Sequence, residues 1–516
     1  MIYVSKDKRV LGVPVRRDLQ NLFPTHHEVT FEGKQLMILK HGIEETILLR
    51  NLGLEVPAPI TSHYDWEGGT PFDSQKKTAE LLTMNRRAYV LNGMGTGKTK
   101  SSLWAWRYLN RVGMAKKLLV VAPLSTLNFT WAKEVFNTLQ GIKVQVLHGT
   151  KDKRLQRLAD LEADVYVINH DGLAVIENEL KNRPDIDTII LDELAVYRNG
   201  TSNRTKLARK VVAKMNWAWG MTGSPTPNAP TDAWGQASIL TPHTVPKYFS
   251  RFREDVMFRI TQFKWAAKED AIDKVYEAMQ PAVRFTLDDV VELPDLVERT
   301  IDIEMGPKQA KVYKQMEEHA FTAIANKEIT AMNAGAVLSK LLQISTGYVY
   351  TREGETVSLD NDERLTALVD AVNSTDRKVI VFVPFVHALE GIAKRITAEG
   401  IDTRTVSGST PKGERDSIFS LFQNTNKIQC ICAHPQCMSH GLTLTAADTI
   451  IWFAPTTSLE TFEQANARIR RIGQKHKQQI LMFQATKAER QMYARLRAKQ
   501  QVQNMLLDMF EEATNA

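Results

Sequence analysis

Two series of apolar, strand-length runs constrain the fold of this 516-residue chain more than any other feature. The first series comprises KLLVVA (117–122), VQVLH (144–148), DVYVIN (164–169), TIILD (188–192) and WAWGMTG (217–223). The second comprises KVIVFV (378–383), the segment around IQCICA, TIIWFA (449–454) and QILMFQ (479–484). Helical patterns separate these near-continuous runs, which is typical of parallel sheets covered on both faces. We therefore expect an α/β protein with two parallel-sheet lobes.

The remaining segments suggest how these lobes are flanked. EVTFEGKQLMIL reads as a β-hairpin that turns at Glu32-Gly33-Lys34, and LGLEVPAPI reads as a linker after it. The predicted parts are a small N-terminal accessory module (1–68), a first lobe (69–245), a mostly helical bridge (246–365), a second lobe (366–488) and a basic C-terminal helix (489–516). The N-terminal module carries no recognisable chemical motif.

Composition narrows the setting of the protein. No apolar run approaches the ~20 residues of a membrane span, and MIYVSKDKRV lacks the apolar core of a signal peptide, so we expect an intracellular protein. Cys430, Cys432 and Cys437 lie close together, but no second Cys/His cluster completes a metal site, which favours structural thiols. The net charge of +7, and a run from Arg468 to Lys499 in which Glu489 is the only acid, suggest a polyanionic partner.

The stretch NGMGTGKTK (92–100) lies between an apolar run and a helical pattern, as a phosphate-binding P-loop does. Glycines let the backbone N–H groups converge on one anion, and a helix N-terminus favours negative charge. Lys98 is predicted to reach the β- and γ-phosphates, and the Thr99 hydroxyl to bind Mg²⁺. One position departs from the general motif, because Asn92 stands where the early glycine belongs and Gly93 follows one place late.

Three further motifs suit phosphoryl transfer. TIILDELA ends a strand with Asp192 and Glu193, which we predict to be the Mg²⁺ carboxylate and the base that acts on the attacking water. MTGSPTPN (221–228) follows another strand and could sense the γ-phosphate. QANARIRRIGQ (464–474) places Arg468 and Arg471 three apart, hence on one helical face, where they are suited to act as arginine fingers.

Taken in order, these motifs resemble the superfamily 2 helicases and, more closely, the Snf-type (Swi/Snf-like) DNA translocases. That family has DEMGLGKT where this chain has NGMGTGKT, so it too lacks the early glycine. VVAPLSTLNFTWAKE, LDELAVYRN, MTGSPTPN, FTLDDVVELPDLVERTIDIEMGPKQAKVY, VSGSTPKGER, SHGLTLTAADTIIW and QANARIRRIGQ resemble its motifs from about Pro71 to Gln484. Forms such as HGLTLTAAD resemble compact members carried by phages and prophages.

The resemblance implies two RecA-like lobes that use ATP and Mg²⁺ to move on duplex, forked or branched DNA. The residues implied to contact the nucleotide are Phe72, Gln75 (reading adenine), Gly93, Met94, Gly95, Thr96, Gly97, Lys98 and Thr99, with Thr99 and Asp192 on the metal. Those implied to grip DNA without reading its sequence are Pro123, Ser125, Ser407, Gly408, Gly441 and Thr443. The resemblance implies DNA rather than RNA as the partner. It implies a location in the cytoplasm or nucleoid of a bacterium, or in the cytoplasm of the host cell if a phage encodes the protein.

Two departures leave other functions open. Ala195 replaces the histidine of the family's DEAH motif, and Ala467 replaces a glycine before Arg468, which puts the coupling of hydrolysis to movement in doubt. The alternatives are a strand-separating DNA or RNA helicase, a nucleic-acid-binding scaffold with little turnover, and a non-motor P-loop enzyme that would leave the second lobe unexplained.

Overall fold

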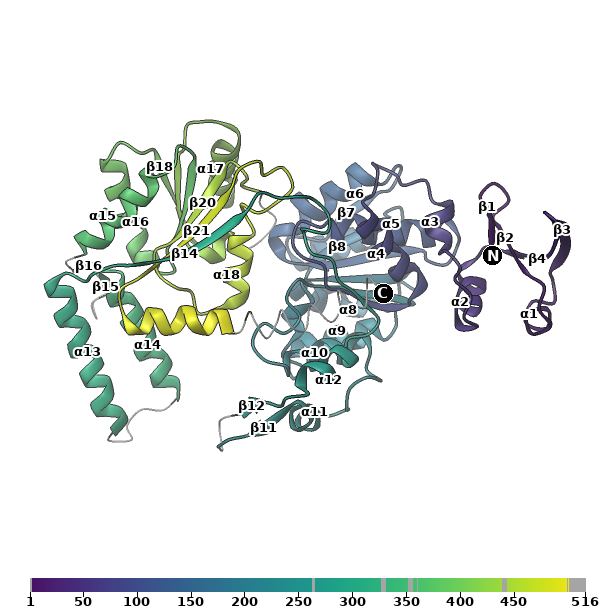
Figure 1. Cartoon of the computed structure of the whole chain (residues 1–516), viewed down its shortest axis with the longest axis horizontal. Helices are drawn as coiled ribbons and strands as arrows, with labels where there is room; N and C mark the ends of the chain where they lie inside the picture. The colour runs from purple at the N-terminus through teal and green to yellow at the C-terminus, as the bar shows by residue number, and fades with distance from the viewer. Residues whose placement is uncertain are drawn as a thin grey trace. The chain divides into compact units, whose positions relative to one another are not determined.

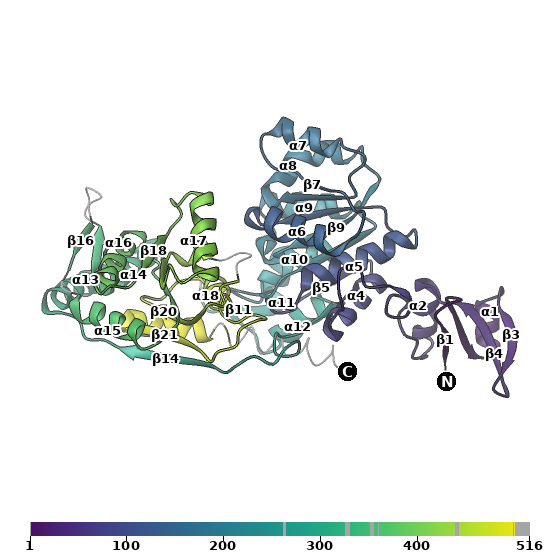
Figure 2. The ribbon, with the colours of Figure 1, turned by 90° about the horizontal axis from the view of Figure 1, so that it is seen from above.

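The structure, a computed structural model, describes residues 2–500 apart from 262–264, 326–330, 351–355, 360, 439–442 and 499. It divides into two compact units, with the boundary between Val290 and Val291. Figures 1 and 2 show the layered α/β arrangement within each unit. Within the described ranges, no helix has the length and apolar character that a membrane span requires.

The N-terminal module is a four-stranded antiparallel sheet. Its strands β1 (Tyr3–Ser5), β2 (Val10–Pro14), β3 (His27–Phe31) and β4 (Lys34–Lys40) pair in the order β1-β2-β4-β3, with helix α1 (Arg17–Leu22) beside them. The predicted hairpin is confirmed, since Glu32 and Gly33 have φ of +49° and +73°, as a two-residue hairpin turn requires.

The segment predicted to be a linker, residues 52–60, joins the N-terminal module to the first large core and is packed against both. It follows helix α2 (Ile43–Asn51) and runs into helix α3 (Pro59–His63). Val56 is buried in the core of the N-terminal module, whereas Ala58 and Ile60 are buried in the first large core. The proline-rich stretch also carries apolar side chains, whose burial is favourable.

The first unit is built on a seven-stranded parallel sheet in the order β13-β5-β10-β9-β6-β8-β7. Its strands are β5 (Arg87–Val90), β6 (Lys117–Ala122), β7 (Val144–Val146), β8 (Val165–Asn169), β9 (Ile186–Asp192), β10 (Trp217–Met221) and β13 (Ala282–Val283). The predicted apolar runs all fall on these strands. They are apolar throughout because alternate residues enter opposite cores, Tyr89 one and Val90 the other.

Helices cover both faces of this sheet. One core receives α4 (Asp73–Met84), α5 (Lys98–Arg111) and α6 (Lys133–Thr138), which follows a π-helical turn at Leu127–Ala132. The other core receives α7 (Lys151–Leu158), α8 (Leu173–Leu180), α9 (Asn203–Val212), α10 (Asp232–Leu240), α11 (Phe249–Val256) and α12 (Ala271–Ala278). A small hairpin, β11 (Met257–Arg259) with β12 (Trp265–Ala267), follows α11.

The second unit is built on a six-stranded parallel sheet in the order β14-β21-β20-β17-β19-β18. Its strands are β14 (Leu296–Asp302), β17 (Lys378–Phe382), β18 (Thr403–Val406), β19 (Cys430–Ala433), β20 (Ala447–Trp452) and β21 (Gln478–Gln484). Helices α15 (Asp362–Asn373), α16 (Val386–Ala398), α17 (Lys412–Asn424) and α18 (Leu459–Asn466) cover it. Cys430 and Cys432 are buried in its core, as expected of structural thiols.

The segment predicted as a bridge, 246–365, contributes to both units. Helices α11 and α12 belong to the first core, whereas β14 is an edge strand of the second sheet. The segment also contains the helices α13 (Pro307–Ala325) and α14 (Ala331–Ser345), which are followed by a hairpin of β15 (Tyr348–Tyr350) and β16 (Thr356–Ser358). Of the predicted C-terminal helix, 487–498 is helical, and the remainder lies outside the described ranges except for Gln500.

Candidate nucleotide site

Three motif-bearing loops leave adjacent strands of the first sheet at the same edge. Met221 of β10 is in register with Val90 of β5 on one side and with Asp192 of β9 on the other. The P-loop, the MTGSPTPN loop and the Asp192-Glu193 pair therefore begin side by side, although up to about 130 residues separate them. Carboxyl ends of parallel strands are where α/β proteins bind ligands.

The P-loop connects β5 to the N-terminus of α5. Gly97 precedes the helix in the left-handed conformation, with φ +81° and ψ +29°, and Gly95 also has φ +81°. The positive φ favours glycine there, and a Cβ atom on Gly97 would lie 2.1 Å from Nε2 of Gln75, so the amide of Gln75 would have to shift. This turn directs the first N–H groups of a fourteen-residue helix toward one point, which suits a phosphate.

Gln75 is held over the loop by its own helix. The Phe72 N–H donates to Oε1 of Gln75 at 3.0 Å, which leaves Nε2 directed to Gly97. Gln75 is buried, while the Phe72 side chain is exposed. An amide fixed on one side and an exposed ring beside it are suited to a planar base. That Gln75 reads adenine and that Phe72 contacts the nucleotide stay predictions.

Lys98 lies folded onto the loop that it follows. Its ammonium donates to the carbonyls of Asn92 and Gly93 at 2.8 and 3.0 Å. The Thr96 hydroxyl also donates to the Gly93 carbonyl, at 2.9 Å. The Lys98 charge is thus positioned by backbone oxygens, and a phosphate oxygen is a stronger acceptor for the same group.

Asp192 ends β9 in a partly buried position. Trp131 Nε1 donates to its Oδ2 at 2.8 Å, and the Glu193 N–H donates to its Oδ1 at 3.1 Å. Burial raises the pKa of Asp192, while Trp131 and the nearby Lys98 charge oppose that rise. A carboxylate that burial disfavours in its charged form gains most from a cation placed beside it.

Glu193 and Thr222 lie beside Asp192 at this edge, and Glu193 has an unusual backbone conformation. Glu193 has φ +51° and ψ +56°, which a non-glycine residue adopts at an energetic cost that is typical of functional sites. The Thr222 N–H donates to the Val90 carbonyl at 3.1 Å, so the MTGSPTPN loop is joined directly to the strand that precedes the P-loop. Ala195 is buried, in the short helix that follows Glu193.

The two predicted arginine fingers follow a helix rather than lie on one. Helix α18 ends at Asn466, and the prediction that Arg468 and Arg471 share a helical face was wrong because the chain turns after that residue. Arg468 is buried, with Nε donating to the Gln464 carbonyl at 2.8 Å. Arg471 donates from Nη1 to Thr443 Oγ1 at 3.3 Å, and burial lowers its pKa to about 10. A predicted finger and a predicted DNA contact of the second unit therefore touch.

The remaining residues predicted to contact DNA lie at the carboxyl ends of strands in their own units. Pro123 and Ser125 follow β6, with Ser125 exposed. Ser407 and Gly408 follow β18, where the Ser407 hydroxyl pairs with that of Ser409 at 2.8 Å. Gly441 lies outside the described residues.

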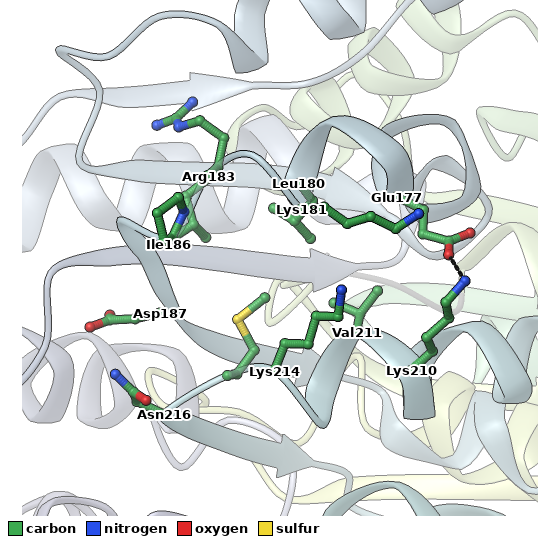
Figure 3. A pocket seen from close by; sticks show the side chains of 12 residues that line it. Glu177, Leu180, Lys181, Arg183, Ile186, Asp187, Lys210, Val211, Lys214 and Asn216 are labelled. Atoms are coloured by element: carbon green, nitrogen blue, oxygen red, sulfur yellow. Dashed lines mark hydrogen bonds and ion pairs between the residues drawn. The ribbon is translucent and has the colours of Figure 1, made fainter.

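A cavity of about 350 Å³ opens elsewhere in the first unit (Figure 3). Its lining residues include Lys181, Lys210 and Lys214 around Leu180 and Met215. Figure 3 shows the ion pair between Lys210 and Glu177. The cavity lies between α8 and α9, near Ile186 and Asn216. These two residues stand at the amino ends of β9 and β10, so the cavity is at the edge opposite the P-loop.

Oxygen donors at the site fit Mg²⁺ bound together with a nucleotide. The ranges covered by the structure contain no group of three His, Cys, Asp or Glu side chains that could hold a metal by themselves. Mg²⁺ in phosphoryl-transfer sites is usually held by one or two protein oxygens together with phosphates and water. Asp192, partly buried at the end of β9, and Thr99, at the start of α5, carry oxygen donors of this kind.

Sequence comparisons identify the class of protein. The SNF2-related domain matches residues 79–347, and the helicase conserved C-terminal domain matches residues 362–473. The first match alone covers more than half of the 516 residues, and the chain belongs to the SNF2-related family. The predicted resemblance is confirmed, together with the fold of two parallel-sheet lobes and the class of enzyme, an ATPase of the helicase type.

Individual relatives are distant. Protein p41 of the Acyrthosiphon pisum secondary endosymbiont phage 1 is 28% identical over 78% of this chain and 88% of its own length. An ATP-dependent helicase of Mycoplasma pneumoniae is 24% identical over 96% of this chain but 46% of its own length. Among solved structures, the Sulfolobus solfataricus SWI2/SNF2 ATPase core in complex with double-stranded DNA is 20% identical over 87% of this chain and 95% of that chain, with a TM-score of 0.40.

Proposed function

We propose that this chain is an ATP-driven motor that moves on duplex, forked or branched DNA inside a bacterial cell. The observation that carries the proposal is the convergence of the P-loop, the Asp192-Glu193 pair and the MTGSPTPN loop at one sheet edge. A second parallel sheet, in whose described connections no such loop occurs, and membership in the SNF2-related family support a motor rather than a small-molecule kinase.

We assign the first unit the chemistry of hydrolysis. Gln75 would bind adenine, and the N–H groups at the start of α5 with the Lys98 ammonium would hold the phosphates. Thr99 and Asp192 would hold Mg²⁺, which supplies charge neutralisation on the phosphate oxygens. Glu193 would orient and deprotonate the attacking water, and its strained backbone supports such a role.

We assign the second unit a part in the transition state and in gripping DNA. Arg471 and Arg468 would stabilise negative charge on the transferred phosphoryl group. The hydrogen bond between Arg471 and Thr443 supports a coupled role, because a change at the arginine reaches a proposed DNA contact directly. Ser407, Gly408 and Gly441 in this unit, and Pro123 and Ser125 in the first, would hold phosphates through hydroxyl and N–H groups.

An ATPase titration tests the proposal. Duplex or forked DNA should stimulate hydrolysis by the full chain more than equal nucleotide concentrations of single-stranded RNA, and Lys98→Ala should abolish the signal. Stimulation by RNA alone would overturn the DNA motor. Several relatives are named ATP-dependent helicases, which favours strand separation as a second candidate. Unwinding of a fluorescently labelled tailed duplex would distinguish it from movement without strand separation.

A further inference from the structure

The chain that leaves the first unit runs along the P-loop before it reaches the unit boundary. Strand β13 pairs in parallel with β5, and the pairing continues beyond both strands. Three alternate N–H groups donate to three alternate carbonyls of this connecting segment (281–290): Tyr89 to Pro281 at 2.9 Å, Leu91 to Val283 at 2.9 Å and Gly93 to Phe285 at 2.7 Å. The last of these donors belongs to the P-loop itself.

The side chain of Asn92 fastens this arrangement. Its Oδ1 accepts from the Phe285 N–H at 3.0 Å, and its Nδ2 donates to Thr78 Oγ1 of α4 at 2.9 Å. Asn92 is only 2% exposed, so both bonds are shielded from water. One side chain therefore joins the P-loop, the connecting segment and the helix that carries Gln75.

Asn92 and Gly93, which bind the connecting segment, also accept hydrogen bonds from the Lys98 ammonium. Lys98 donates to the carbonyls of Asn92 and Gly93, while the connecting segment binds the Asn92 side chain and the Gly93 N–H. From the other direction, Arg284 Nη1 donates to the Leu91 carbonyl at 2.6 Å. When Lys98 turns to a phosphate, it must leave two carbonyls of a backbone that the connecting segment holds.

We propose that Asn92 is a positioning residue that couples the P-loop to the connecting segment, so that nucleotide binding is transmitted to the chain entering the second unit at Val291. This rests on the proposed ATP site. Glycine, which the general P-loop motif has at this position, could make neither side-chain bond. This coupling gives a physical role to the asparagine that stands at position 92 in place of the glycine of the general motif.

Hydrogen–deuterium exchange on the full chain tests the coupling without requiring turnover. A non-hydrolysable ATP analogue with Mg²⁺ should change exchange by about threefold or more in peptides covering 281–290 of the wild type, because breaking or strengthening one buried hydrogen bond shifts local opening by that order. Asn92→Ala should remove most of this response. Asn110→Ala is the matched control, because Asn110 also donates to backbone carbonyls but lies at the far end of α5.

Kinetics separate coupling from a merely structural role. In Asn92→Ala we expect the ratio of the DNA-stimulated ATPase rate to the rate without DNA to fall about tenfold, the order expected for loss of two buried hydrogen bonds. In Thr78→Val, which keeps the hydrogen bond between Asn92 and Phe285, we expect stimulation by DNA to lie between that of the wild type and that of Asn92→Ala. This variant remains informative if Asn92→Ala does not fold.

The outcomes distinguish this coupling from the ATP site on which it rests. Failure of the wild type to bind a fluorescent ATP analogue would overturn both. Binding without an exchange response at 281–290, or a full response in Asn92→Ala and Thr78→Val, would overturn the coupling alone. An equal loss in Asn110→Ala would also overturn it, since the effect would then be one of general stability.

Discussion

The two parallel sheets differ most at the connection between a central strand and its helix. In the first unit, β5 and α5 are separated by residues 91–97, with left-handed glycines and a lysine directed back onto the loop. In the second unit, β17 and α16 are separated by residues 383–385, which contain no glycine, and Phe385 precedes the helix with extended backbone. The α/β layout therefore supplies a platform, and loop length with positive φ decides whether it binds phosphate.

The units also use buried polar groups differently. In the second unit, Arg364 is 2% exposed and Glu489 is fully buried, and they form an ion pair at 2.6 Å. Arg364 also donates to the carbonyls of Phe453, Ser345 and Phe483. In the first unit, Asp192 is only partly buried and accepts two hydrogen bonds. The network of Arg364 and Glu489 in the second unit has its polar groups paired and stabilises the fold. The carboxylate of Asp192 in the first unit has capacity for a ligand.

The largest effect should come from Lys98→Ala. Loss of the charge that we propose to hold the transferred phosphate should lower DNA-stimulated ATPase activity by about 10³-fold or more, roughly 4 kcal/mol of transition-state stabilisation. Steady-state hydrolysis measures it. Lys394→Ala on α16 is the control from the second unit, where an exposed lysine should be dispensable for hydrolysis. Equal losses of hydrolysis in Lys98→Ala and Lys394→Ala would contradict the contrast between the two strand–helix connections.

Glu489→Ala should destabilise the second unit by about 3 kcal/mol. Removing one partner of a buried ion pair usually costs ~3–5 kcal/mol, and the lower end applies because Arg364 keeps its carbonyl acceptors. Chemical denaturation followed by a fluorescence probe in each unit should place the loss in the second unit only. A double replacement with Arg364→Met and Glu489→Leu should recover part of it, and no recovery would argue against a cost of unpaired charge.

Trp131→Phe should reduce hydrolysis by about three- to tenfold, because the indole N–H that orients Asp192 is removed while most of the packing remains. The rate at saturating ATP and Mg²⁺ is the readout. Trp217→Phe removes a comparable indole hydrogen bond, to the Met114 carbonyl at the opposite sheet edge, and should leave the rate unchanged. If both substitutions slow hydrolysis alike, the effect is one of packing.

Asp192→Asn should give the smallest change in stability, a gain of about 1 kcal/mol or less without nucleotide at neutral pH. Because burial raises the pKa of Asp192, the folded state binds its proton more tightly than the unfolded state. The wild type is therefore penalised increasingly as pH rises through the folded pKa, and below the unfolded pKa the penalty vanishes. Melting temperatures of both proteins at acid and neutral pH, without Mg²⁺, measure the difference. A gain that is equal at both pH values would rule out this electrostatic cause.

Sequence patterns predicted the central strands of each sheet best. The runs in the centre of each sheet are apolar on both faces, and all of them form strands. The patterns missed β14 (LVERTID) and β18 (TRTV) because these edge strands carry polar residues. Trp131 lay within a motif that was recognised, but its spacing carries no sign that the indole would reach Asp192.

The sequence by itself determined the α/β class, the two lobes, the P-loop with Lys98 and Thr99, and the family, because these depend on local periodicity and on ordered motifs. Only the tertiary structure decided which distant groups meet. Register across β5, β10 and β9 brings Asp192 to the P-loop, and the pairing of β13 with β5 brings Phe285 to Asn92. Such contacts follow from strand order, which hydrogen bonding between remote segments sets and which no local pattern encodes.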